Sequence, residues 1–221
     1  MAILICAATT TEYNAVQRAL RKTGAIHKFN LLRTGMGARA AQAALLNELS
    51  NHARTPDLVI STGFAGGLSE KFEIGSWVYD ASTNSVRPPN SWIEILGAVP
   101  VLVRNAEKVV HPGSNMNLSE AVDMESATLS KICSDRKIPF AVLRLISDNP
   151  RAPLPTFVGD WMELSNAETL TAKSAMFVTA FTRTIRQPLR VWGLVRNARR
   201  WRRDLHAGWV RLGYRVGTHG L

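Results

Sequence analysis

A short apolar run that ends in glycines decides the fold: residues 56–67 read PDLVISTGFAGG. Its first half, residues 58–61, has the length and composition of a buried strand. The glycines that follow, in residues 62–67, predict a turn whose backbone can approach a ligand closely because side chains are absent. Similar apolar runs lie on both sides and alternate with longer helical patterns, which is typical of an α/β sheet covered by helices.

The other elements follow from the same patterns. Apolar runs predict strands at residues 3–8, 28–33, 77–79, 100–104 and 140–146. Apolar side chains at three- and four-residue spacing predict helices at residues 11–23, 38–53, 124–136, 166–186 and 189–212. Turn formers predict loops at 84–92 and 111–117, and three prolines break regular structure in residues 149–155.

Composition and charge divide the chain into two parts. Its 221 residues are 46% hydrophobic and 20% charged, which is typical of one globular domain and excludes a disordered chain. Residues 1–169 contain 16 basic and 16 acidic side chains, whereas residues 170–221 contain 11 basic side chains and one acid, Asp204. We therefore predict a domain at 1–186 and a basic amphipathic C-terminal segment at 187–221.

The C-terminal segment allows three interpretations. Its apolar side chains recur at helical spacing: Val191, Leu194, Ala198, Trp201, Leu205, Trp209 and Leu212. The helix could rest on an anionic membrane, with Trp192, Trp201 and Trp209 at the interface and arginines on headgroups. It could instead pack its apolar stripe against its own domain or a second subunit. As a third alternative, its arginines could bind nucleic acid in a non-catalytic module, although no folded nucleic-acid-binding motif is visible.

Cysteines and apolar segments indicate the compartment. Cys6 and Cys133 lie in apolar patterns, so we expect two buried free thiols and no disulfide. The N-terminus lacks the basic region of a signal peptide, and no apolar run approaches the roughly 20 residues that span a bilayer. We expect a cytoplasmic protein, with peripheral contact to the inner membrane as a further hypothesis.

Acidic side chains follow the predicted strands, where α/β sheets bind ligands. Glu12 follows the first strand and could act as a base or cap the next helix. Glu125 could accept protons from two ribose hydroxyls or complement a helix N-terminus. Asp148, after Ser147, ends the strand at 140–146, where burial could raise its pKa and let it donate a proton; a Ser-Asp turn is the alternative.

The order of these segments resembles the superfamily of purine nucleoside phosphorylases and methylthioadenosine/S-adenosylhomocysteine nucleosidases. The resemblance is carried by ILICAATTTEY, TGMGARAAQAA, PDLVISTGFAGGLSEKFEIGSWV, AVDMESATLSKIC and IPFAVLRLISD, and it covers about residues 2–79 and 121–148. It implies a three-layer αβα fold with a central mixed sheet. The tail, LPTFVGDWMEL followed by RVWGLVRNARRWRRDL, is similar to the hopanoid-associated branch, which removes adenine from adenosylhopane.

The resemblance also implies a role for each site residue. Asp148 would protonate the departing purine at N7, and Glu12 would orient or deprotonate the attacking water. Glu125 would bind the ribose 2′- and 3′-hydroxyls, and Met124 would pack against the sugar, unless Met124 is a core residue. The remaining substrate-binding candidates are Phe64, Ala65, Gly66 and Ser147. The resemblance implies a homodimer, with water or phosphate as co-substrate and neither cofactor nor metal.

Two departures from the superfamily bear on the reaction. Phe64 stands where its members usually have a hydroxyl residue, and an aromatic ring cannot donate to phosphate, which favours hydrolysis over phosphorolysis. Residues 80–121 form a shorter stretch without the superfamily's base-stacking segment, so the base-binding residues are not predicted. A soluble methylthioadenosine/S-adenosylhomocysteine nucleosidase and an inactive member are the alternatives to a nucleosidase for a lipid-linked adenosine.

Overall fold

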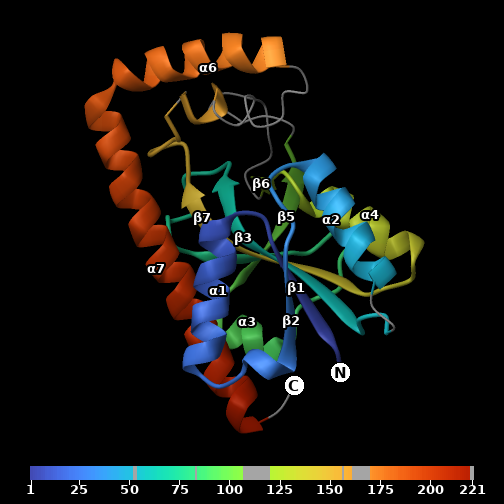
Figure 1. Cartoon of the computed structure of the whole chain (residues 1–221). Coiled ribbons are helices and arrows are strands. Elements are labelled where there is room, and N and C mark those ends of the chain that lie inside the picture. The colour runs from blue at the N-terminus through green and yellow to red at the C-terminus, as the bar shows by residue number, and fades with distance from the viewer. Residues whose placement is uncertain (52–53, 83, 107–119, 156, 161–169, 220–221) are drawn as a thin grey trace.

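The computed structural model describes residues 1–51, 54–82, 84–106, 120–155, 157–160 and 170–219 (Figure 1). The strands are β1 (Ile3–Ala7), β2 (Phe29–Arg33), β3 (Leu58–Gly67), β4 (Trp77–Asp80), β5 (Val99–Asn105), β6 (Glu120–Asp123) and β7 (Phe140–Asp148). The helices are α1 (Thr10–Lys22), η1 (Ile26–Lys28), α2 (Ala38–Asn51), α3 (Asn90–Leu96), α4 (Ser126–Asp135), α6 (Leu170–Ile185) and α7 (Pro188–His219).

The seven strands within the described residues form one mixed sheet in the order β2-β1-β3-β6-β5-β4-β7. β3 pairs in parallel with β1 and β7 and antiparallel with β6, while β4 pairs antiparallel with β7. The predicted mixed α/β sheet is therefore confirmed. Because β3 also pairs with β7, the strands from β3 round to β7 close on themselves and the sheet curls. Local patterns did not predict this closure, since it depends on pairing between distant segments.

The turn predicted at residues 62–67 is wrong, because β3 continues through it to Gly67. β7 pairs with β3 from Val59 to Gly66, and β6 pairs with Gly66 and Gly67, so these glycines belong to the sheet. The loop predicted at 84–92 is also wrong in its last three residues, where α3 begins at Asn90. β6 was not predicted, and the loop predicted at 111–117 lies outside the described residues.

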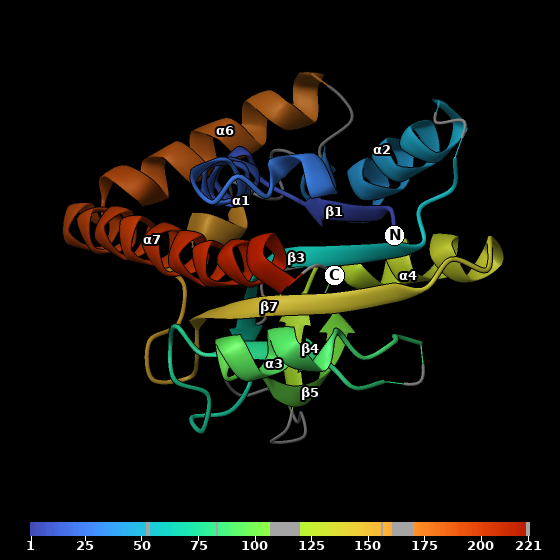
Figure 2. The same cartoon turned by 90° about the horizontal axis from the view of Figure 1, so that it is seen from below.

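Helices cover both faces of the sheet and complete three layers (Figures 1 and 2). α1, α3 and α7 lie over the face of Ile3, Ile5 and Leu143. α2 and α4 cover the opposite face, where the two cysteines are buried as free thiols, as predicted. The side chains alternate between the two faces as the pleat requires.

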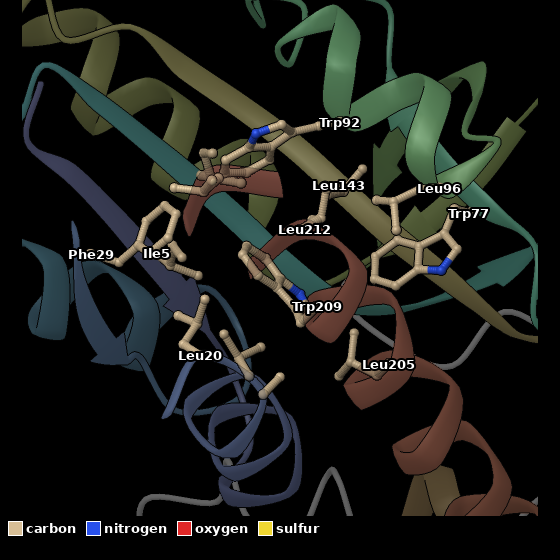
Figure 3. Close-up of a cluster of buried hydrophobic side chains, with 14 of the residues drawn as sticks. Ile5, Leu20, Phe29, Trp77, Trp92, Leu96, Leu143, Leu205, Trp209 and Leu212 are labelled. Carbon is tan, nitrogen blue, oxygen red and sulfur yellow. The ribbon is translucent and has the colours of Figure 1, made fainter. Parts of the chain in front are cut away.

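The C-terminal helix α7 belongs to the core of the first face. Leu205, Trp209, Leu212 and Val216 are buried there. Figure 3 shows Trp209 among side chains of the other elements, and its ring centroid lies 5.8 Å from that of Trp92. Residues of the C-terminal segment at 187–221 therefore share one hydrophobic core with residues of the predicted domain at 1–186.

The placement of Trp201 and Trp209 at a membrane interface is wrong. Both rings are buried, because the apolar stripe of α7 packs on its own domain, whereas Trp192 is 65% exposed. Gly208 allows this close packing: a Cβ at this position would lie 2.3 Å from the ring of Trp77. None of the described helices is both long and apolar enough to cross a membrane.

Candidate active site

A cavity of about 260 Å³ opens at the carboxyl ends of β1, β3, β6 and β7, beside the start of α1. The eight predicted site residues all line it: Glu12, Phe64, Ala65, Gly66, Met124, Glu125, Ser147 and Asp148. Ten lining residues were not predicted: Ala8, Thr9, Met36, Ala106, Val122, Asp123, Leu154, Val158, Leu194 and Trp201. Segments far apart in the sequence thus converge on one cavity, as expected at this edge of an α/β sheet.

Glu12 is held rigidly at the first turn of α1. The Thr9 amide and hydroxyl each donate to its Oε2 at 2.7 Å, and the Glu12 amide donates to Thr9 Oγ1. This reciprocal pair is a capping box, so the capping function predicted for Glu12 is confirmed. Its other oxygen, Oε1, accepts the Phe64 amide at 2.8 Å and brings the carboxylate to the cavity.

Gly63 makes room for this carboxylate. Its φ is +149°, and a Cβ here would lie 2.2 Å from Glu12 Oε1 and 3.3 Å from Arg144 Nη1. A side chain at residue 63 would therefore displace Glu12 from the Phe64 amide.

Asp148 is the last residue of β7, and Ser147 accompanies it into the cavity. The Ser147 hydroxyl lies 2.6 Å from Asp148 Oδ1 and also contacts the Ala65 carbonyl. Burial raises the pKa of Asp148, and the hydrogen bond from Ser147 opposes this shift only in part. A carboxyl group with a raised pKa keeps its proton to higher pH and can donate it within the site.

Met124 and Glu125 connect β6 to α4, which begins at Ser126, two residues after the predicted helix start at residue 124. Glu125 makes no side-chain cap to α4; its Oε1 instead accepts the Gly37 amide at 2.7 Å. Burial raises the pKa of Glu125 from its ordinary value of 4.5 to about 7, against the lowering effects of Arg144 and the Gly37 amide. Met124 lines the cavity beside it.

A buried arginine lies behind the carboxylates and was not predicted. Arg144 is 2% exposed, in the middle of the apolar strand β7. Its Nε donates to Asp123 Oδ2 at 2.8 Å, and its Nη2 donates to Ser61 Oγ at 2.7 Å. Ser126 completes the group by donating to Asp123. The one available signal was a charged residue inside a run that is otherwise apolar.

The positive charge of Arg144 interacts with three acids. Burial by itself would lower the pKa of its guanidinium, but the carboxylates of Asp123, Glu125 and Glu12 outweigh burial and raise it. Arg144 therefore stays charged and reduces the mutual repulsion of the acids around it.

The remaining wall of the cavity is apolar. Leu154 and Val158 supply part of it, and Leu194 and Trp201 reach it from α7. The Trp201 ring centroid lies 6.2 Å from that of Phe64, which closes this side with aromatic surface. No base-binding residue was predicted within 80–121. Of the residues that the structure describes in this stretch, Ala106 lines the cavity.

The site combines a buried acid, a fixed carboxylate and an apolar wall. Such an arrangement can protonate a leaving group and orient a nucleophile on a small molecule. The described side chains include no group of three His, Cys, Asp or Glu residues that could hold a metal ion.

Comparisons with known proteins agree on one superfamily. A family model described as the phosphorylase superfamily matches residues 110–183. A 5′-methylthioadenosine/S-adenosylhomocysteine nucleosidase from Tolumonas auensis is 25% identical over 180 residues, which cover 63% of this chain and 76% of the relative.

Solved structures of nucleosidases with the same name have the same fold. The one from S. pneumoniae, with the transition-state inhibitor MT-ImmA, has a TM-score of 0.56 at 16% identity and covers 96% of this chain and 100% of its own. The one from Neisseria meningitidis, in complex with methylthio-immucillin-A, has a TM-score of 0.54 at 20% identity, with 83% and 99% covered. The resemblance predicted from the sequence is confirmed at the level of the superfamily.

Proposed function

We propose that this chain, an enzyme related to the phosphorylase superfamily, releases adenine by hydrolysis from a nucleoside that carries an apolar 5′ substituent. The observation that carries the proposal is the convergence of Glu12, Glu125 and Asp148 on one cavity at the carboxyl edge of the sheet. Three carboxyl groups in three environments can act as acid, base and sugar ligand in the same reaction.

Asp148 is the proposed acid. Its proton passes to N7 of the purine while the bond between C1′ and N9 breaks, and the electron pair of that bond stays with the base. Burial supports this role, because the raised pKa of Asp148 favours the protonated form. Ser147 holds the carboxyl group in place through Oδ1.

Glu12 is the proposed base. A water molecule attacks C1′ of the oxocarbenium-like sugar and gives its proton to Glu12, so that the products are adenine and a free ribose derivative. Oxygen atoms of a carboxylate can accept more than one hydrogen bond, so Glu12 can receive the water while it keeps the Thr9 and Phe64 donors. Those donors restrict its orientation, which reduces the entropic cost of placing the water.

Glu125 is the proposed ligand of the 2′- and 3′-hydroxyls, with Met124 against the sugar. The Gly37 amide fixes Glu125 Oε1 and thereby orients the carboxyl group. The positive charge of Arg144 favours the charged form of Glu125, and this form can accept hydrogen bonds from both hydroxyls.

Water is favoured over phosphate by the aromatic side of the site. Phe64 offers its ring to Trp201 and its amide to Glu12, so this residue presents no side-chain donor to an anion. Phosphate would also meet several acids, since the carboxylates of Glu12, Asp123 and Glu125 all interact with Arg144 and offset its charge.

The apolar wall supports a nucleoside with an apolar 5′ group. Once C1′ carries the base and Glu125 holds the two hydroxyls, C5′ is the remaining position of the ribose from which a substituent can extend. Leu154, Val158 and Leu194 offer such a substituent an apolar surface. A lipid-linked adenosine such as adenosylhopane is the proposed substrate, in a homodimeric enzyme; methylthioadenosine and S-adenosylhomocysteine are the small alternatives.

Product analysis tests both the substrate and the nucleophile. Each nucleoside is incubated with and without phosphate, and adenine, free ribose derivative and ribose 1-phosphate derivative are measured. We expect phosphate-independent release of adenine, faster from the lipid-linked nucleoside than from the small thioethers. Turnover of the thioethers alone would exclude the lipid proposal, and phosphate-dependent turnover would exclude hydrolysis.

Two substitutions test the roles of the acids. Asp148→Asn and Glu12→Gln should each lower adenine release by about 10² or more, because a positioned acid or base contributes roughly that factor. Asp135→Asn, which changes an exposed carboxylate on α4, is the matched control and should leave turnover unchanged. Near-normal turnover of either site variant with an intact thermal transition would overturn the assignment.

A further inference from the structure

We propose that the corner between α6 and α7 is a membrane-docking surface that takes anionic lipid and lies against the apolar wall of the active-site cavity. The corner surface consists of the exposed apolar side chains Phe177, Phe181, Ile185, Leu189, Trp192 and Val195, with Arg186 and Arg190 among them. The inference rests on the proposed function for its purpose, which is to meet a lipid-linked substrate, but its test needs no catalysis.

The exposed apolar side chains of this protein are concentrated at one place. Of the twelve large hydrophobic residues that are exposed within the described part of the chain, six lie between residues 177 and 195. Ile185, Leu189 and Trp192 are 60%, 86% and 65% exposed. Scattered single residues of this kind need no explanation, but a run of successive helical turns marks an interaction surface.

Spacing makes these residues continuous stripes. Phe177, Phe181 and Ile185 follow at four-residue steps on one side of α6, and the rings of the two phenylalanines stack at 5.7 Å. Leu189, Trp192 and Val195 follow at three-residue steps on α7. Ile185 ends one stripe and Leu189 begins the other, on either side of the turn between the helices, which forms the corner in Figure 1.

The positive charge of the corner surface favours an anionic lipid surface as its partner. Residues 169–203 contain nine basic side chains and no acid. Arg186 and Arg190 are exposed at the corner itself, and the Arg196 guanidinium lies over the Trp192 ring at 5.2 Å. Apolar side chains that enter the lipid boundary beside arginines that meet headgroups are typical of helices lying on anionic membranes. A second copy of this chain would bring the same cationic surface against itself, which disfavours a symmetric dimer through the corner.

The corner is continuous with the active site. Leu194 lines the cavity, while Trp192 and Val195, its near neighbours on α7, point to solvent. The cavity and the proposed lipid surface therefore lie on different sides of the same turn of α7. α6 lies beyond the edge of the sheet at which β3 and β7 end, so docking there would bring the cavity toward the membrane (Figure 1).

Vesicle co-sedimentation of the full chain, without any nucleoside, tests the proposal. The vesicles contain phosphatidylcholine alone or phosphatidylcholine with phosphatidylglycerol, and we expect binding to the anionic vesicles. Truncation is unsuitable, because α7 carries core residues such as Trp209. Arg186→Ala with Arg190→Ala should weaken binding by about fivefold for each arginine, or about 25-fold together.

Matched controls lie at the other end of the same helix. Arg211→Ala with Arg215→Ala removes the same charge from exposed positions and should weaken binding far less. Leu189→Ser with Trp192→Ser should abolish binding, whereas Tyr214→Ser, also at an exposed position, should preserve it.

Three results would overturn the proposal: absence of binding to the anionic vesicles, equal losses from the two arginine pairs, or a dimer that Leu189→Ser with Trp192→Ser converts to monomer in light scattering. The last result would assign the corner to a second copy of the chain. Because adenine release is not measured, failure of the proposed function and failure of docking are distinguishable.

Discussion

Replacing Trp209 by alanine tests whether α7 is part of the cooperative core. Trp209 is fully buried, and its ring lies 5.8 Å from Trp92 and 6.4 Å from Phe29. Its Nε1 also donates to Thr62 Oγ1 at 3.3 Å, so truncation leaves the buried Thr62 hydroxyl without this donor. The substitution therefore removes apolar area, aromatic contacts and a hydrogen bond together.

The expected loss can be estimated in two ways. A buried tryptophan removes about 200 Å² from water, which corresponds to about 5 kcal/mol at about 25 cal/mol per Å². Substitutions of core tryptophan by alanine cost about 3 to 5 kcal/mol. Because an extended reference chain overestimates buried area, we expect Trp209→Ala to lower the free energy of unfolding by about 4 kcal/mol. In a chain of this size the melting temperature should fall by about 8 to 16 °C.

Chemical denaturation followed by tryptophan fluorescence and circular dichroism measures this loss. Trp192→Ala is the matched control, because Trp192 lies on the same helix but is mostly exposed. It should change the free energy of unfolding by less than about 0.5 kcal/mol. If Trp209→Ala unfolded within about 1 kcal/mol of the wild type, the argument that α7 completes the core would be refuted.

Two further predictions concern the carboxylates. Gly63→Ala should lower adenine release by about 10² or more, because its Cβ would displace Glu12. Gly24→Ala is the control and should leave turnover unchanged, because Gly24 also has a positive φ but a Cβ there would meet nothing within 4 Å. Equal activities of the two variants would contradict the proposed role of the Glu12 position. Glu125 binds its proton more tightly in the folded chain, so wild-type stability should fall as pH rises from 4.5 through about 7, relative to Glu125→Gln. The difference should approach about 3 kcal/mol in denaturation curves above pH 7, and parallel pH profiles of the two proteins would rule out the raised pKa.

Much of the site could be predicted because its residues follow strands. Glu12 lies a few residues after one apolar run, and Asp148 ends another, so a rule about the edges of α/β sheets was enough to group them. The same rule also singled out Glu125, and the resemblance to the superfamily then gave Met124 its place against the sugar. Arg144 was not predicted, because in the sequence it is only a residue within a strand. The carboxylates that stabilise its buried charge come from other elements, and the sequence does not show that they lie beside it.

The sequence by itself determined which side chains must leave water and which strands carry the acids, because apolar periodicity and the order of segments are local properties. Tertiary structure alone decided what covers each apolar face. Trp209 and Trp192 occupy the same basic amphipathic pattern, yet one lies in the core and the other faces outward. A helical stripe of apolar residues is the same in sequence whether core, lipid or a partner covers it, and only the packing of distant elements distinguishes these cases.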